Sequence, residues 1–175
     1  MGISKDNYFK NFILGVTCES IQIDSRQVNQ DAILKLLSSA QNQICIISRY
    51  LDPTIFSTQE FIDNASEFIR RSKTSSIRIL VHDTDPMVKN NHRILSLSQR
   101  VSSKIEIRTI CNDYSQFNQS YVVADSRAYI HNLKGDLYDA EVNFNDPDKS
   151  NELMEKFKNI WELSQQEAEV RRLCI

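Results

Sequence analysis

The sequence predicts an α/β fold built on one mixed sheet, parallel in the first half of the chain and antiparallel in the second. Two apolar runs of strand length, residues 44–47 and 77–81, are separated by an amphipathic helical pattern. Such alternation of strand and helix favours a parallel arrangement. After Cys111, three strand patterns follow one another without intervening helices, and strands so closely spaced must pair largely antiparallel. Helices are expected to flank the sheet.

The first half of the chain reads strand, helix, strand, helix, strand. The pattern over residues 12–24 predicts a strand, followed by a helix that Asp24 or Ser25 caps and whose apolar face ends at Ala40. The run 44–47 predicts a strand buried on both faces. A second amphipathic helix is expected over residues 58–71.

The second half continues this order and then changes it. Pro86 suits the first turn of a helix that extends to Val101, because its missing amide hydrogen costs nothing there. A strand follows at residues 105–110. The three closely spaced strands are expected at residues 121–124, 128–130 and 141–144. Residues 146–148 then start a long final helix.

Composition limits the protein class. With 175 residues we expect a flexible arm over residues 1–11 and a single α/β domain over residues 12–175. The formal net charge of −2 gives no global attraction to nucleic acid or anionic lipid. The N-terminal residues form neither a secretory signal nor a membrane span, so we expect a cytoplasmic protein. With only three glycines the chain has no glycine-rich phosphate loop, and we expect no cofactor.

Residues 117–125 read Phe-Asn-Gln-Ser-Tyr-Val-Val-Ala-Asp. This stretch resembles the phospholipase D motif, in which His, any residue, Lys, four residues and Asp follow in order. Asn118 occupies the His position, Ser120 occupies the Lys position, and Asp125 matches. The likeness to one half of the phospholipase D superfamily extends over nearly the whole chain from Ser20 onward, including the strand pattern 104–108 and the closing strand and helix.

A closer resemblance is to an uncharacterised bacterial family of degenerate phospholipase D-like domains, some of them attached to acetyltransferases. The residues that carry it are 49–53, 80–83, His92 and 101–103. The resemblance implies a phospholipase D-like fold. It supplies no function for this chain.

The same resemblance implies that the superfamily's chemistry is missing. In active relatives the histidine forms a covalent phosphohistidine and the lysine neutralises the phosphate oxygens. Asn118 cannot act as that nucleophile, and Ser120 carries no charge. The glycine-serine-asparagine element that usually follows is also replaced, since residues 129–132 read Tyr-Ile-His-Asn. Because the superfamily assembles one active site from two halves, a single half is expected to form a homodimer.

Polar residues are expected to gather where the parallel strands end, since open sheets bind ligands beyond the carboxyl ends of such strands. If the strand that holds Tyr121 runs antiparallel, Asn118 and Ser120 reach the same edge. The candidate ligand-binding residues are Arg49, His82, Asp83, Asp85, Asn118, Ser120 and Asp125. Two interpretations stay open: Arg49 binds an anion through its planar fork, or it pairs with Asp83 or Asp85 and only joins two loops.

Two other site types are weighed against this. The group His82, Asp83, Asp85 and His92 is suitable for a transition metal, but Asp83 and Asp85 precede Pro86 in the pattern of a helix start, and we expect no metal. The basic residues Arg70, Arg71, Lys73, Arg100, Lys104 and Arg108 lack interleaved aromatic residues. We therefore do not expect nucleic acid as a partner.

The sequence thus predicts a non-catalytic phospholipase D-like domain that acts as a binding, dimerisation or regulatory module. A phosphate-bearing small ligand and a protein such as an acetyltransferase are the expected kinds of partner. The alternative is a hydrolase or transferase for a small phosphate-containing substrate, with His82 as general base beside Arg49. The question whether the chain is an enzyme stays open, although the loss of both motif residues favours a non-enzyme.

Overall fold

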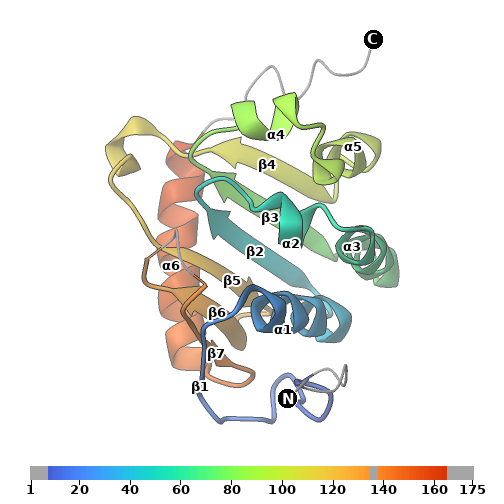
Figure 1. The fold of residues 1–175 in the computed structure, drawn as a ribbon, viewed down its shortest axis with the longest axis vertical. Coiled ribbons are helices and arrows are strands. Elements are labelled where there is room, and N and C mark those ends of the chain that lie inside the picture. Colours follow the sequence, from blue (N-terminus) through green and yellow to red (C-terminus); the bar gives the residue numbers. More distant parts are fainter. Residues whose placement is uncertain (1–7, 135–137, 165–175) are drawn as a thin grey trace.

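A seven-stranded sheet in the order β1-β7-β6-β5-β2-β3-β4 organises the chain (Figure 1). The computed structural model describes residues 8–134 and 138–164. The strands are β1 (Ile21–Ile23), β2 (Gln43–Ser48), β3 (Ser76–Val81), β4 (Ile105–Thr109), β5 (Ser120–Ala124), β6 (Ala128–Asn132) and β7 (Ala140–Asn143). The helices are α1 (Arg26–Ser39), α2 (Pro53–Phe56), α3 (Gln59–Arg71), α4 (Asp85–Lys89), α5 (Arg93–Arg100), the 3-10 helix η1 (Asn112–Tyr114) and α6 (Pro147–Leu163).

The predicted mixed sheet is confirmed. Strands β2, β3 and β4 are parallel neighbours, whereas β5 pairs antiparallel with β2 and is followed by antiparallel β6 and β7. Strand β1 does not join the parallel group. It pairs antiparallel with β7 at the edge of the sheet. No helix in the described part of the chain is long and apolar enough to cross a membrane.

Helices cover both faces of the sheet, and each face has its own apolar core. Helices α1, α3 and α5 lie on one face, and α6 lies on the other (Figure 1). Alternate residues of the central strands divide between the two: Ile46 and Val122 belong to the α1 side, and Ile47 and Tyr121 belong to the α6 side. Burial on both faces explains why β2 reads as a continuous apolar run.

Two local predictions are wrong. Residues 12–20 do not form a strand, because the chain turns at Gly15, whose φ is +81°, and leaves Val16 exposed. The helix expected from Pro86 to Val101 is broken into α4 and α5. Asn91, with φ +49°, lies in the left-handed region, and the His92 ring then caps α5 by accepting a hydrogen bond from Ile94 N at 3.4 Å.

The expected flexible arm over residues 1–11 falls largely outside the described residues, which begin at Tyr8. Phe9 is fully buried, and its ring lies 5.6 Å from that of Phe144, the residue after β7. Phe9, with the partly buried Phe12 and Leu14, therefore packs this segment against the core.

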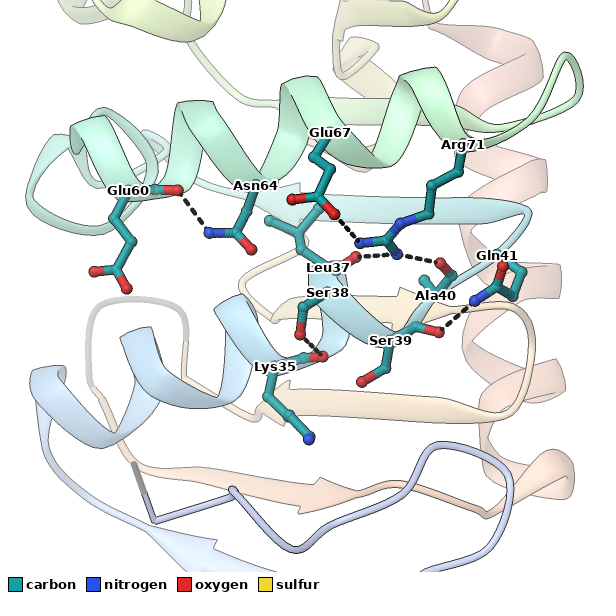
Figure 2. Close-up of polar contacts among 10 residues, drawn as sticks. All are labelled: Lys35, Leu37, Ser38, Ser39, Ala40, Gln41, Glu60, Asn64, Glu67 and Arg71. Atoms are coloured by element: carbon teal, nitrogen blue, oxygen red, sulfur yellow. Dashed lines mark hydrogen bonds and ion pairs between the residues drawn. The ribbon is translucent and has the colours of Figure 1, made fainter. Parts of the chain in front are cut away.

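Helices α1 and α3 are joined by an arginine (Figure 2). Nη1 of Arg71 donates to the carbonyl oxygens of Leu37 at 3.2 Å and Ala40 at 2.8 Å, and Nη2 lies 3.4 Å from Glu67. The last carbonyl groups of a helix have no partners within the helix. Arg71 therefore satisfies the end of α1, which carries no basic residue of its own in its last turn.

Candidate functional site

The carboxyl ends of β2 and β3 bring three of the predicted residues together. Arg49 follows β2, His82 follows β3, and Asn118 precedes the antiparallel β5. The His82 amide donates to the Arg49 carbonyl oxygen at 3.1 Å, and Nη1 of Arg49 donates to Oδ1 of Asn118 at 3.4 Å. We call this group of Arg49, His82 and Asn118 the rim site.

The Arg49 guanidinium lies at the surface beside an aromatic ring. Its Nε donates to the Tyr50 hydroxyl at 3.1 Å, and its central carbon lies 5.5 Å from the centroid of that ring. Stacking of this kind limits the orientations of a guanidinium group. Tyr50 was not predicted as a site residue, although its position next to Arg49 in the sequence was visible.

His82 is half-buried at the rim site. Burial lowers the pKa of its imidazole, and the neighbouring Arg49 charge lowers it further, while the backbone of Phe117 acts in the opposite direction. The ring is therefore mainly neutral near pH 7, since even an unperturbed histidine has a pKa of about 6.5. A neutral imidazole can accept a proton or a hydrogen bond, but it adds no positive charge for an anion.

The two predicted aspartates have local roles. Asp83 Oδ1 accepts a hydrogen bond from the Asp85 amide at 2.9 Å, which forms the turn into α4. The Asp85 carboxylate lies 3.7 Å from Lys89 one turn later. Both residues are exposed. The Arg49 side chain contacts Tyr50 and Asn118.

Ser120 lines a cavity of about 70 Å³ between the sheet, α1 and α2. Its Oγ is buried and has no hydrogen-bond partner among the described residues. The polar wall opposite includes Asp52, whose Oδ2 accepts a hydrogen bond from the Tyr138 hydroxyl at 2.6 Å. Asp52 and Tyr138 were missed as lining residues because they are 86 positions apart, which leaves no local sequence signal.

Asp125 does not belong with the other candidates. Because β5 runs antiparallel to β2, its far end lies at the amino end of β2, about 17 Å along the strand from Ser120. Oδ2 of Asp125 accepts a hydrogen bond from Gln41 N at 2.7 Å, and Oδ1 accepts from Asn42 N and Gln43 N, both at 2.8 Å. The carboxylate thus organises the connection from α1 to β2. Asp125 therefore lies apart from the other candidate ligand-binding residues.

The structure also places the other weighed groups. His92 is buried, and its Nε2 lies 3.1 Å from the Leu51 carbonyl oxygen, so it does not approach His82 as a second ligand. Across residues 8–134 and 138–164, no group of three His, Cys, Asp or Glu residues is close enough to hold a metal ion. Of the basic residues, Lys104 donates to the Ser72 carbonyl oxygen, and Arg108 donates to that of Trp161.

Comparison with known proteins places the chain in a family. A family model described as "Domain of unknown function (DUF7931)" matches residues 25–173. The chain belongs to this family. No curated protein matches the DUF7931 chain.

Solved structures resemble the DUF7931 chain in fold. Nuc from Salmonella typhimurium, a phospholipase D family member, has a TM-score of 0.63 at 14% identity, covering 85% of this chain and 97% of its own. NucT from Helicobacter pylori has a TM-score of 0.56 at 12% identity, covering 85% and 99%. The predicted phospholipase D-like fold is thereby confirmed. Identities this low establish the fold alone.

A third neighbour is larger. TrmBL2, described as an archaeal chromatin protein with a novel mode of DNA binding, has a TM-score of 0.65 at 16% identity. The match covers 91% of the DUF7931 chain but 57% of the TrmBL2 chain. The shared fold therefore occurs within longer chains as well as in chains of this size.

Proposed function

We propose that this chain is a non-catalytic phospholipase D-like domain that binds a phosphate-bearing ligand at the rim site. The observation that carries the proposal is the contact of the Arg49 guanidinium with Asn118, next to the His82 imidazole. Guanidinium groups bind phosphate through paired, charge-assisted hydrogen bonds. Asn118 adds a neutral hydrogen-bonding group where the phospholipase D motif has its nucleophile, and Ser120 stands where the motif has its cation, so the site is suited to binding rather than bond cleavage.

The ligand test uses inorganic phosphate and pyrophosphate as probes. We expect saturable chemical-shift changes at the amides of Arg49, His82 and Asn118 in ¹⁵N NMR spectra. Arg49→Gln should weaken this binding by about tenfold or more, because a charged hydrogen-bond donor is lost. Arg100→Gln is the matched control, since it removes an exposed arginine from the end of α5 and should leave the affinity unchanged. Equal binding by the two variants would refute the rim site.

The absence of catalysis needs its own measurement. Bis(p-nitrophenyl) phosphate and a phosphomonoester should not be hydrolysed above the rate in buffer. Turnover that disappears in His82→Ala would instead support the enzyme alternative, a hydrolase or transferase with repurposed residues. One observation favours that alternative: burial lowers the pKa of His82, and a general base must be neutral at working pH.

We also propose that the domain self-associates through the rim. Tyr50 exposes 48% of its surface there, and Phe117 is half-buried nearby. Aromatic residues beside an arginine are typical of the centres of protein interfaces. Light scattering over a concentration series should show a dimer, and Tyr50→Ser should weaken it. A monomer at the highest attainable concentration would contradict the dimer and leave the ligand proposal standing.

A further inference from the structure

A second hollow lies away from the rim site, on the α6 face of the sheet and near the edge formed by β6, β7 and β1. It is a groove of about 490 Å³ over β6, β7 and β1, which is within the usual range for small-molecule sites. Lys134 and Asp139 line one part of it, and Lys149, in the first turn of α6, lines another. Figure 1 shows β7 and β1 beyond the central strands, with α6 on this face.

Three polar side chains form a row across the floor of the groove. His131 of β6 lies directly opposite Glu141 of β7, and Glu141 lies directly opposite Gln22 of β1. Residues opposite each other in antiparallel strands have Cβ atoms about 4.5–5.5 Å apart and point to the same face. A ligand that enters the groove therefore meets all three side chains together.

Glu141 is held in place with one oxygen atom uncommitted. Its Oε1 accepts hydrogen bonds from Ser20 Oγ at 2.9 Å and from the Tyr129 hydroxyl at 2.8 Å. Burial and the hydrogen bond to Glu141 raise the pKa of Tyr129, so this phenol stays protonated and continues to donate. Both bonds are made to the same oxygen, and Oε2 accepts none from residues 8–134 or 138–164. The carboxylate is thus preorganised and can accept a further donor.

His131 supplies a second acceptor. Its side chain is 6% exposed, and Nε2 lies 3.1 Å from the Gln119 side-chain oxygen. Nε2 must carry the proton for that contact to be a hydrogen bond, which leaves Nδ1 as an acceptor. Burial lowers the pKa of this imidazole, and the charge of Lys149 lowers it further, so the ring is neutral near pH 7.

Two lysines give the same groove positive charge. Lys149 Nζ lies 3.2 Å from Glu152, but an ion pair at the surface contributes little free energy and exchanges readily for another carboxylate. Lys134 is exposed and makes no ion pair with another described residue. The groove also holds the carboxylates of Asp139 and Glu141, so its formal charges balance.

We propose that this groove binds a small zwitterion of the amino-acid class. The ligand's ammonium group lies on Glu141 and His131, and its carboxylate lies on Lys149. A simple anion would meet the two carboxylates, and a simple cation would meet the two lysines, so neither complements the groove. Leu133, which exposes 69% of its surface, lines the same groove and favours an aliphatic side chain on the ligand.

The test compares L-leucine with two compounds that each carry one of its charged groups. Isotope-labelled protein is titrated with L-leucine, with 4-methylpentanoate, which lacks the ammonium group, and with 3-methylbutylamine, which lacks the carboxylate. We expect saturable shifts at the amides of Gln22, His131 and Glu141 with L-leucine below about 10 mM, and about tenfold weaker binding of each half-ligand. Absence of saturable shifts, or equal affinity for the three compounds, would overturn the proposal.

Two variants test the assignment of groups. Glu141→Gln should weaken L-leucine binding by about tenfold, whereas Glu155→Gln, on an exposed turn of α6, should not change it. Lys149→Gln should weaken binding of L-leucine and 4-methylpentanoate but not of 3-methylbutylamine. Far-ultraviolet circular dichroism confirms that each variant is folded before titration. Glu141→Gln protein that is folded and binds L-leucine like the wild type would exclude the groove as the site.

Discussion

Asp125 offers the sharpest test of how the motif strand is used. If its carboxylate organises the connection from α1 to β2, its replacement should destabilise the fold and leave the rim site intact. Three backbone N–H groups donate to it, from Gln41, Asn42 and Gln43. Asp125 also has φ +52°, a region that Asp and Asn tolerate better than other residues with a side chain. The lost hydrogen bonds and the positive φ together determine how much free energy of unfolding each variant loses.

The variants Asp125→Asn, Asp125→Gly and Asp125→Ala separate the two effects. Hydrogen bonds to a charged group contribute about 1.5–3 kcal/mol each, but Gln41 and Asn42 are exposed, and water replaces much of what they lose. We therefore expect Asp125→Gly, which keeps the backbone unstrained, to lower the free energy of unfolding by about 2–3 kcal/mol. Asp125→Ala should lower it by about 1 kcal/mol more, because Ala is strained at a positive φ. Asn keeps Oδ1 and the backbone tolerance, and should lose about 1–2 kcal/mol.

Urea unfolding followed by Trp161 fluorescence measures these losses, because Trp161 is the only tryptophan and is 7% exposed. Glu155→Ala removes an equal charge from an exposed position and should stay within about 0.5 kcal/mol of the wild type. If all three Asp125 variants also stay within that range, the structural role is refuted. Folded Asp125→Asn should bind phosphate as the wild type does, since it lies at the opposite end of β5 from the rim site.

Two further predictions concern stability. Arg71→Ala should lower the free energy of unfolding by about 2 kcal/mol, because the Leu37 and Ala40 carbonyls lose charge-assisted hydrogen bonds. Arg70→Ala, on the exposed side of α3, is the matched control, and equal losses in the two variants would contradict the role of Arg71. The free energy of unfolding should fall as pH is lowered below about 6.5. Burial lowers the pKa of His82, His92 and His131, so the unfolded chain binds protons in this range that the folded protein does not. Each histidine contributes at most about 1.4 kcal/mol per pH unit to this loss. Urea midpoints from pH 7.5 to about pH 5 measure this slope, His92→Gln should reduce it, and a midpoint independent of pH would contradict the pKa shifts.

Much of the fold could be predicted from the sequence because its signals are local. Ser25, one of the two predicted caps, caps α1, and its Oγ accepts a hydrogen bond from Val28 N at 3.3 Å. The failures have physical causes. The strand expected from residue 12 begins only at Ile21, because the chain turns at Gly15 and leaves Val16 exposed. The helix after Pro86 breaks at Asn91, and the signal that was missed is the residue type itself, since Asn adopts the left-handed backbone more readily than most residues.

The candidate site was only partly predictable for a related reason. The contact between Arg49 and Asn118 follows from a general rule, since the carboxyl end of a strand and the start of its antiparallel neighbour meet at one edge. The same rule removes Asp125 from that edge, which the motif pattern obscured. Contacts between distant segments could not be inferred at all. Tyr138 reaches Asp52, and Glu141 faces His131, through the packing of the whole sheet.

Positions 118, 120 and 125, which the sequence aligns with the phospholipase D motif, differ in what folding requires of them. Asn118 lies before β5 begins and is exposed, so a change there leaves the two apolar cores intact. Ser120 borders a cavity that tolerates a change in side-chain size. Asp125 instead accepts three backbone hydrogen bonds that join two elements. Substitution at 118 and 120 therefore alters chemistry at little cost to stability, while substitution at 125 affects folding itself. Of the three, Asp125 carries the least information about catalysis.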